Sequence, residues 1–177
     1  KERILEFIAK NKRVNTQKGI VLLLTGPPGV GKTSIAKSIG ECLQRPTTVI
    51  SMGGQNDPIH IKGSKRTYVD SQPGIFVKEL QRLECKNPVI VIDEIDKADI
   101  EFPNDLLREL DRMEFYCYET RELVRAKNRP LVFITSNNEK ELPDAFLRRC
   151  FFHYIKFPEA DTMRKIVDVH FPNLKKE

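Results

Sequence analysis

The segment "GPPGVGKTS", from Gly26 to Ser34, constrains this chain more than any other feature of its sequence. It follows the apolar run "IVLLL" and precedes "IAKSIGECL", whose apolar residues recur at helical spacing. Glycine and proline favour a tight loop at such a junction, and the first N–H groups of the following helix face that loop without partners. The segment therefore predicts a site that attracts anions between a buried strand and a helix.

The spacing inside this loop matches a pattern that cradles phosphates. Four residues separate Gly26 from the sequence Gly31-Lys32-Thr33. In that pattern backbone N–H groups hold the phosphates, Lys32 reaches the β and γ oxygens, and Thr33 ligates Mg²⁺. A turn that is merely rich in glycine and proline is the weaker alternative, because strand, loop and helix agree. The residues predicted to bind the cofactor are Gly26, Pro27, Pro28, Gly29, Val30, Gly31, Lys32, Thr33 and Ser34.

Composition sets broad limits on the class of protein. The 177 residues suit one globular domain, and no apolar stretch approaches the roughly 20 residues of a membrane-spanning helix. We see no signal peptide and expect no membrane partner. The net charge of +5 comes from basic residues scattered among acids, which favours a solvated surface over a nucleic-acid-binding face. Four widely spaced cysteines indicate reduced thiols and an intracellular, cytoplasmic location.

Apolar periodicity predicts strands alternating with helices. Strands are expected in "IVLLL", "TTVISM", "NPVIVIDE", "PLVFITSNN" and "FFHYIKF", the last at an edge or the end of the sheet. Helices are expected at the N-terminus, after the glycine loop, from Ile75, from Phe102, in "LPDAFLRRC" and in "EADTMRKIVDVHF". "EFYCYETRELVRA" fits a hairpin, with a helix after Thr120 as the alternative. The pattern predicts an α/β fold with a parallel sheet sandwiched by helices over residues 1–177.

Two acids end the strand "VIVIDE" about 60 residues after the glycine loop. On the carboxyl edge of such a sheet, Asp93 would hold Mg²⁺ through water. Glu94 would orient and deprotonate the attacking water, which requires a carboxylate near the γ-phosphate. The alternative is a pair of acids that merely cap a strand.

Two further features gain weight from these motifs. Asn137 ends another apolar strand, where its amide could bond both the water and the phosphate, although an isolated Asn there is usually a turn residue. Arg148 and Arg149 offer guanidinium groups that could neutralise transition-state charge in a neighbouring subunit. Taken alone, paired arginines more often mark a solvated helix end.

These four elements in this order resemble the AAA+ ATPases, with a Walker A loop, a Walker B strand, a sensor Asn and an arginine finger. The resemblance implies a P-loop fold, ATP and Mg²⁺ as cofactors, and a homo-oligomer, a hexameric ring in the parent families. It also favours Arg149 over Arg148 as the finger. The segments "KERILEFIA", "GPPGVGKTSIAKSIG", "GSKRTYVDSQPG" and "NPVIVIDEIDKA" look like the ATPase module of Lon protease.

The Lon resemblance assigns Tyr68 and Val69 to a pore loop that grips an unfolded polypeptide substrate. The alternative for Tyr68 is a tyrosine that packs a surface loop. Lon proteins usually have glycine after Tyr-Val, whereas Asp70 stands here, which puts translocation in doubt. If the Lon-like part is eukaryotic, the resemblance would also allow the mitochondrial matrix.

Downstream of "DEIDKA" the sequence looks like the MoxR branch of AAA+ proteins instead. The two resemblances, residues 1 to about 98 and about 93 to 177, meet in the Walker B phrase and suggest a chimera with a seam near residues 93–98, constructed rather than natural. Because the sequence stops in the first helix after Pro158, we expect no helical lid, no peptidase domain and no proteolysis. We also expect nucleotide affinity below that of an intact module.

Three functions remain open at this point. The first is Mg-dependent ATP hydrolysis, coupled in the parent families to protein unfolding or remodelling. The second is a chimeric scaffold that binds nucleotide weakly and turns over negligibly. The third, a motor associated with nucleic acid, depends only on net charge.

Overall fold

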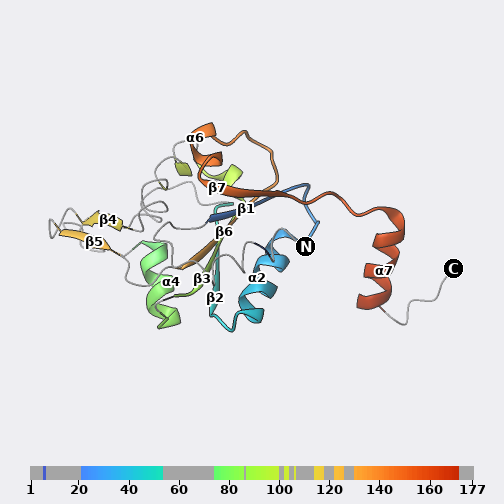
Figure 1. The fold of residues 1–177 in the computed structure, drawn as a ribbon, viewed down its shortest axis with the longest axis horizontal. Coiled ribbons are helices and arrows are strands. Elements are labelled where there is room, and N and C mark those ends of the chain that lie inside the picture. Colours follow the sequence, from blue (N-terminus) through green and yellow to red (C-terminus); the bar gives the residue numbers. More distant parts are fainter. Residues whose placement is uncertain are drawn as a thin grey trace.

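Five parallel strands form the central sheet of the computed structural model (Figure 1). The structure describes residues 6, 21–53, 74–85, 87–99, 102–103, 106, 114–117, 122–125 and 130–171. The strands are β1 (Val21–Thr25), β2 (Thr47–Ser51), β3 (Val89–Asp93), β6 (Leu131–Ser136) and β7 (Cys150–Tyr154). They lie in the order β2-β3-β6-β1-β7, and every neighbouring pair is parallel. The predicted α/β fold with a parallel sheet is confirmed.

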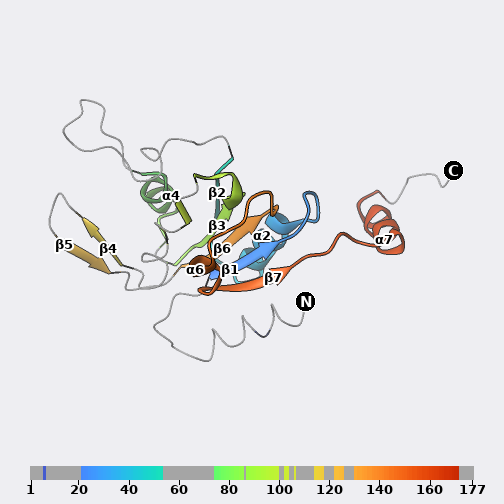
Figure 2. The same ribbon diagram turned by 90° about the horizontal axis from the view of Figure 1, so that it is seen from above.

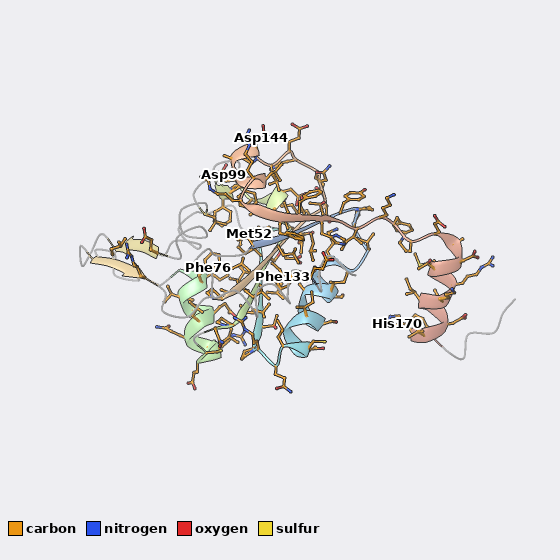
Figure 3. All side chains as sticks on the ribbon, in the orientation of Figure 1. Met52, Phe76, Asp99, Phe133, Asp144 and His170 are labelled. Atoms are coloured by element: carbon orange, nitrogen blue, oxygen red, sulfur yellow. The ribbon has the colours of Figure 1, made fainter. Side chains whose placement is uncertain are left out.

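The central strands β1, β3 and β6 are apolar up to their carboxyl ends because both faces of the sheet are covered. Along β1 the side chains alternate, so that Val21 and Leu23 join one buried cluster and Leu22 and Leu24 join the other. Phe133 on β6 is fully buried and lies inside the body of the protein (Figure 3). A strand with two buried faces reads as a continuous hydrophobic run, which is why these strands could be predicted.

Helices cover the two faces of this sheet. Helix α2 (Lys32–Cys42) packs Ile35, Ala36 and Ile39 on the cluster that contains Phe133. Helix α4 (Ile75–Leu83) and the short helix α6 (Asp144–Leu147) pack on the other cluster. A 3₁₀ turn, η1 (Ile95–Lys97), follows β3. The sheet is therefore a middle layer between helices, as predicted.

A two-stranded antiparallel hairpin stands apart from the main sheet. It consists of β4 (Glu114–Cys117) and β5 (Glu122–Arg125). Glu114 and Arg125 are opposite each other, and the Arg125 Nε donates to the Glu114 Oε2 at 2.9 Å. The predicted hairpin is confirmed, and the alternative of a helix after Thr120 is wrong for Glu122–Arg125. The cross-strand pairing provides the backbone hydrogen bonds that a helix would otherwise supply.

The chain continues from the edge strand β7 into helix α7 (Ala160–His170). In both ribbon views α7 extends away from the sheet, at the opposite end of the molecule from the β4–β5 hairpin (Figures 1 and 2). The predicted edge strand and last helix are both confirmed. None of the helices within the described ranges combines the length and the hydropathy needed to span a bilayer.

Some predictions fall outside the described residues. The N-terminal helix is among them, apart from Glu6, which is helical. Tyr68 and Val69, the residues predicted for a pore loop, also lie outside the described residues. So does most of the helix expected from Phe102, of which Phe102, Pro103 and Leu106 are described and helical.

Candidate nucleotide-binding site

The loop between β1 and α2 has the backbone that its glycines predict. Gly26, Gly29 and Gly31 have φ values of +151°, +80° and +84°, which side chains rarely tolerate. A Cβ added at Gly29 or Gly31 would meet no atom within 4 Å, so the loop borders open space at both positions. Gly31 precedes α2 without any side-chain cap. The loop therefore presents backbone N–H groups beside a space of the kind that a phosphate group would fill.

Lys32 begins helix α2 and folds back over this loop. Its side chain is buried, and the Nζ donates hydrogen bonds to the carbonyl oxygens of Gly26 and Pro27, each at 2.8 Å. Burial lowers the pKa of Lys32, and the nearby negative charges of Asp93, Asp96 and Glu94 oppose that shift. The two carbonyl oxygens thus hold the Lys32 Nζ at the mouth of the loop.

Thr33 joins the loop to the end of β3. Its Oγ1 donates a hydrogen bond to the Asp93 Oδ1 at 2.7 Å, across 60 residues of sequence. The Oγ1 of Thr135 on β6 donates a short hydrogen bond to the same oxygen. Two hydroxyl groups from different elements therefore fix the Asp93 carboxylate beside Thr33.

Glu94 lies just beyond Asp93 in an unusual backbone conformation. Its φ is +58°, in the left-handed region that non-glycine residues seldom occupy. Its N–H donates to the Thr135 Oγ1 at 3.0 Å, and its Oε1 accepts from the Lys97 Nζ at 2.8 Å. That hydrogen bond raises the pKa of Lys97. The left-handed turn sends the Glu94 carboxylate toward Gly53, where a Cβ would collide with Oε2.

Asn137 is the first residue after β6. Its N–H donates to the Asp96 Oδ1 at 3.3 Å, and its Nδ2 donates to the Glu139 Oε1 at 3.4 Å. Because β1, β3 and β6 are adjacent and parallel, their carboxyl ends bring Lys32, Asp93 and Asn137 to one edge of the sheet. The structure thus gathers the predicted loop, acids and Asn at a single place.

Arg148 and Arg149 lie at the end of α6, and both are exposed. The Arg149 Nη1 donates to the Ala145 carbonyl oxygen at 2.8 Å, within its own helical turn. Both arginines therefore lie on the surface of the protein, away from the β1–α2 loop in sequence, and a role in a neighbouring subunit stays a prediction.

Three residues that the sequence did not single out complete this site, namely Thr135, Asp96 and Lys97. Thr135 contacts both acids, Asp96 is buried and bonds the backbone after β6, and Lys97 pairs with Glu94. A signal for Thr135 was present, because it is a polar residue near the end of the same apolar strand that Asn137 follows. The three-acid phrase "DEID" was the signal for Asp96.

The donor set fits Mg²⁺ held together with a phosphate. A hydroxyl and a carboxylate stand side by side in Thr33 and Asp93, and Mg²⁺ is usually held by one or two protein oxygens, phosphates and water. The described residues contain no group of three or more His, Cys, Asp or Glu that could enclose a metal. Thr33 and Asp93 are therefore suited to a metal that arrives with a nucleotide.

The parallel sheet and the glycine loop before α2 define this chain as a P-loop α/β domain. The family model "AAA domain (dynein-related subfamily)" matches residues 21–150, and the chain belongs to this family. AAA domains are nucleotide-binding domains, which agrees with the geometry of the loop.

The chain is also similar to Lon proteases. That of Xanthomonas oryzae pv. oryzae is 40% identical over 154 residues, 84% of this chain and 18% of the relative. Lon protease 1 of Bacillus subtilis is 36% identical over 188 residues, 100% of this chain and 24% of the relative. That of Nitratidesulfovibrio vulgaris is 48% identical over 105 residues, 59% of this chain and 13% of the relative. The chain spans a quarter or less of the length of these curated relatives.

Two further predictions concern the cysteines and the MoxR-like region. Cys42, Cys85 and Cys150 form no disulfide in the described part of the chain. The alignment with Lon protease 1 of Bacillus subtilis covers 100% of this chain. The similarity to Lon proteases therefore extends through the region interpreted as MoxR-like. The MoxR resemblance and the seam near residues 93–98 stay predictions.

Proposed function

We propose that this chain binds Mg-ATP in the β1–α2 loop and hydrolyses it as one AAA domain over residues 1–177. The observation that carries the proposal is the contact of Thr33 with Asp93, which places the metal-binding hydroxyl beside the metal-binding carboxylate. Thr33 and Asp93 would hold Mg²⁺, which would supply positive charge to the phosphates during transfer.

The chain's own residues have separate roles in this proposal. Lys32 supplies a positive charge to the terminal phosphates, with the N–H groups of the loop. Glu94 accepts the proton of the attacking water, and its Oε2 is available for this while the Oε1 accepts the hydrogen bond from Lys97. Asn137 orients that water, and Arg149, rather than Arg148, reaches the site of a neighbouring copy.

The coupling of hydrolysis to mechanical work is a further part of the proposal. The similarity to Lon proteases supports a homo-oligomeric, hexameric ring that unfolds or remodels polypeptides, with Tyr68 and Val69 in the pore. An intracellular, cytoplasmic location also stays a prediction. A chimeric scaffold that binds nucleotide without turnover is the second candidate, favoured by the MoxR-like phrase after "DEIDKA".

Calorimetric titration with ATP and Mg²⁺ tests the binding step. Lys32→Ala should weaken binding at least about 100-fold, because a charge-assisted contact to phosphate is lost. Lys37→Ala on the exposed face of the same helix is the matched control and should bind normally. Equal binding by the wild type and Lys32→Ala would contradict the assignment of the loop.

Turnover measured against protein concentration separates the two candidates. Hydrolysis that rises with assembly and falls about 100-fold or more in Glu94→Gln supports the enzyme. Glu84→Gln is the matched control, since Glu84 is exposed and also has a positive φ, of 48°. Turnover that stays at zero at every concentration, with normal binding, supports the scaffold.

A further inference from the structure

Asp96 is a buried carboxylate to which neither the fold nor the proposed reaction assigns a role. It lies in the turn η1, two residues after Glu94, and only 2% of its surface is exposed. Its Oδ1 accepts the N–H of Asn137 at 3.3 Å, and its Oδ2 accepts the N–H of Glu139 at 3.1 Å. Both oxygens therefore bind the backbone of one turn, the turn that follows β6.

This arrangement provides hydrogen-bond partners for a polar group in a buried place. A buried side chain without partners is disfavoured, whereas each Asp96 oxygen accepts a hydrogen bond from a backbone N–H group. The two oxygens of the Asp96 carboxylate accept the neighbouring N–H groups of Asn137 and Glu139, which an amide side chain could not do with both of its terminal atoms. In an asparagine, one of the two atoms would be an NH₂ group that opposes a backbone N–H.

The turn that Asp96 holds contains Asn137. Asn138 has a φ of +62° there, and its N–H donates to the Ser136 Oγ at 2.9 Å, so the backbone bends at this residue. The direction of the Asn137 side chain is set by this backbone. Asp96 thus connects the turn that carries Glu94 to the turn that carries Asn137.

A second contact between the same two strand ends is independent of Asp96. Thr135 binds Asp93 and the N–H of Glu94, so it fixes the acids from β6. Asp96 makes the reverse connection, from the β3 side to the backbone beyond β6. With Thr135 holding the acids, Asp96 is left to hold Asn137.

We propose that Asp96 is a positioning residue that fixes the Asn137 amide relative to Glu94 for attack by water. The proposal rests on the proposed hydrolysis of ATP. In this proposal Asp96 acts through Asn137, and only its charge reaches Lys32, so its loss should impair turnover more than nucleotide affinity.

Steady-state kinetics of the full chain test this role through a double-mutant cycle. Asp96→Asn should lower kcat about 10- to 100-fold, the range for a residue that orients another at a site, with KM changed less than about 3-fold. Added to Asn137→Ala, it should lower kcat no further, because the group that it positions is already gone. Asp144→Asn, at an exposed aspartate of α6, is the control and should leave both constants unchanged.

Two kinetic results would overturn the proposal. One is a pair of effects that multiply in the double variant, since Asp96 would then act independently of Asn137. The other is a raised KM with unchanged kcat, which would place Asp96 in nucleotide binding.

Amide hydrogen exchange tests the same contact without catalysis. In the wild type without added nucleotide, the amides of Asn137 and Glu139 should exchange at least about 10-fold more slowly than unstructured amides, and Asp96→Asn should remove that protection. Unprotected amides in the wild type would overturn the proposal even if the variant did not fold. Absent ATP turnover, with protection seen, would instead count against the proposed function alone.

Discussion

The central strands β1, β3 and β6 and the C-terminal arm, residues 150–171, contain similar apolar residues in opposite environments. Phe133 on β6 is fully buried, whereas Phe152 and Phe157 in the arm are 49% and 58% exposed. Helix α7 lies away from the sheet, as the position of His170 shows (Figure 3). The residues that gather at the loop lie at or just beyond the carboxyl ends of the central strands. The comparison shows that the residues of the candidate site are attached to the most buried strands of the protein. Tight packing of those strands keeps the side chains of the site in fixed positions.

The largest expected effect tests this contrast directly. Phe133→Ala should lower the free energy of unfolding by about 3–5 kcal/mol, because it leaves a cavity between sheet and helix. Phe152→Ala is the matched change in the arm and should lower it by less than about 1 kcal/mol. Urea unfolding followed by circular dichroism measures both. Equal losses would show that the arm is packed as tightly as the core.

Gly26 lies where the β1–α2 loop contacts the arm at Ile155. Its substitution therefore tests how tightly the arm packs against the loop. A Cβ at Gly26 would collide with the carbonyl oxygen of Ile155, and the φ of +151° adds strain. Gly26→Ala should therefore cost about 2 kcal/mol or more in unfolding free energy. Gly29→Ala has strain but open space, and should cost about 1 kcal/mol. Thermal denaturation of both variants compares them, and a reversed order would refute this view of the junction.

Two buried threonines on adjacent central strands give an intermediate effect. Thr135→Val should cost about 1–3 kcal/mol in unfolding free energy, because the N–H of Glu94 loses its acceptor. The Thr25 Oγ1 is buried without a hydrogen-bond partner among the described residues, so Thr25→Val should be neutral or stabilising. Urea unfolding measures the pair. A Thr25→Val loss as large as that of Thr135→Val would contradict the assigned hydrogen bonds.

The smallest effect concerns acid stability at the contact of α4 with β2. Hydrogen bonds from Arg82 and from Thr48 lower the pKa of Glu79 below its ordinary 4.5. A lowered folded pKa means that this stabilisation is present above the unfolded pKa and is lost as pH falls through the folded value. Glu79→Gln should therefore flatten the loss of stability between about pH 5 and about pH 3. Melting temperatures of the wild type and Glu79→Gln across that pH range test this prediction, with Glu84→Gln as the control. Parallel curves of melting temperature against pH for the wild type and Glu79→Gln would contradict it.

The sequence predicted the central strands and the loop well because their signals are local. Runs such as "VLLL", "VIVI" and "LVFI" mark strands buried on both faces, and glycines mark the positive φ values between them. The β4–β5 hairpin was less certain because short alternating segments also fit a helix, and only pairing across the strands decides between them.

The supporting residues of the site could not be predicted with the same ease. Thr135 contacts Asp93 because β6 lies beside β3, and that strand order follows from the whole topology rather than from spacing. Asp96 and Lys97 resemble ordinary acids and bases of a charged turn until burial and partners are known. Whether Glu94, Asn137 and Arg149 perform their predicted roles is a question for the kinetic tests above.

The hydrogen bonds of Lys32 and Thr33 have one more consequence. Lys32 is bonded to two loop carbonyls and Thr33 to Asp93, so an arriving ligand has to replace contacts that the protein already makes. Under the proposed function, Mg-ATP would supply phosphate oxygens to Lys32 and a metal to Thr33 in exchange, whereas a phosphate without the metal would replace only the contacts of Lys32. The bonds that the loop already makes would therefore favour a phosphate chain that arrives together with its metal.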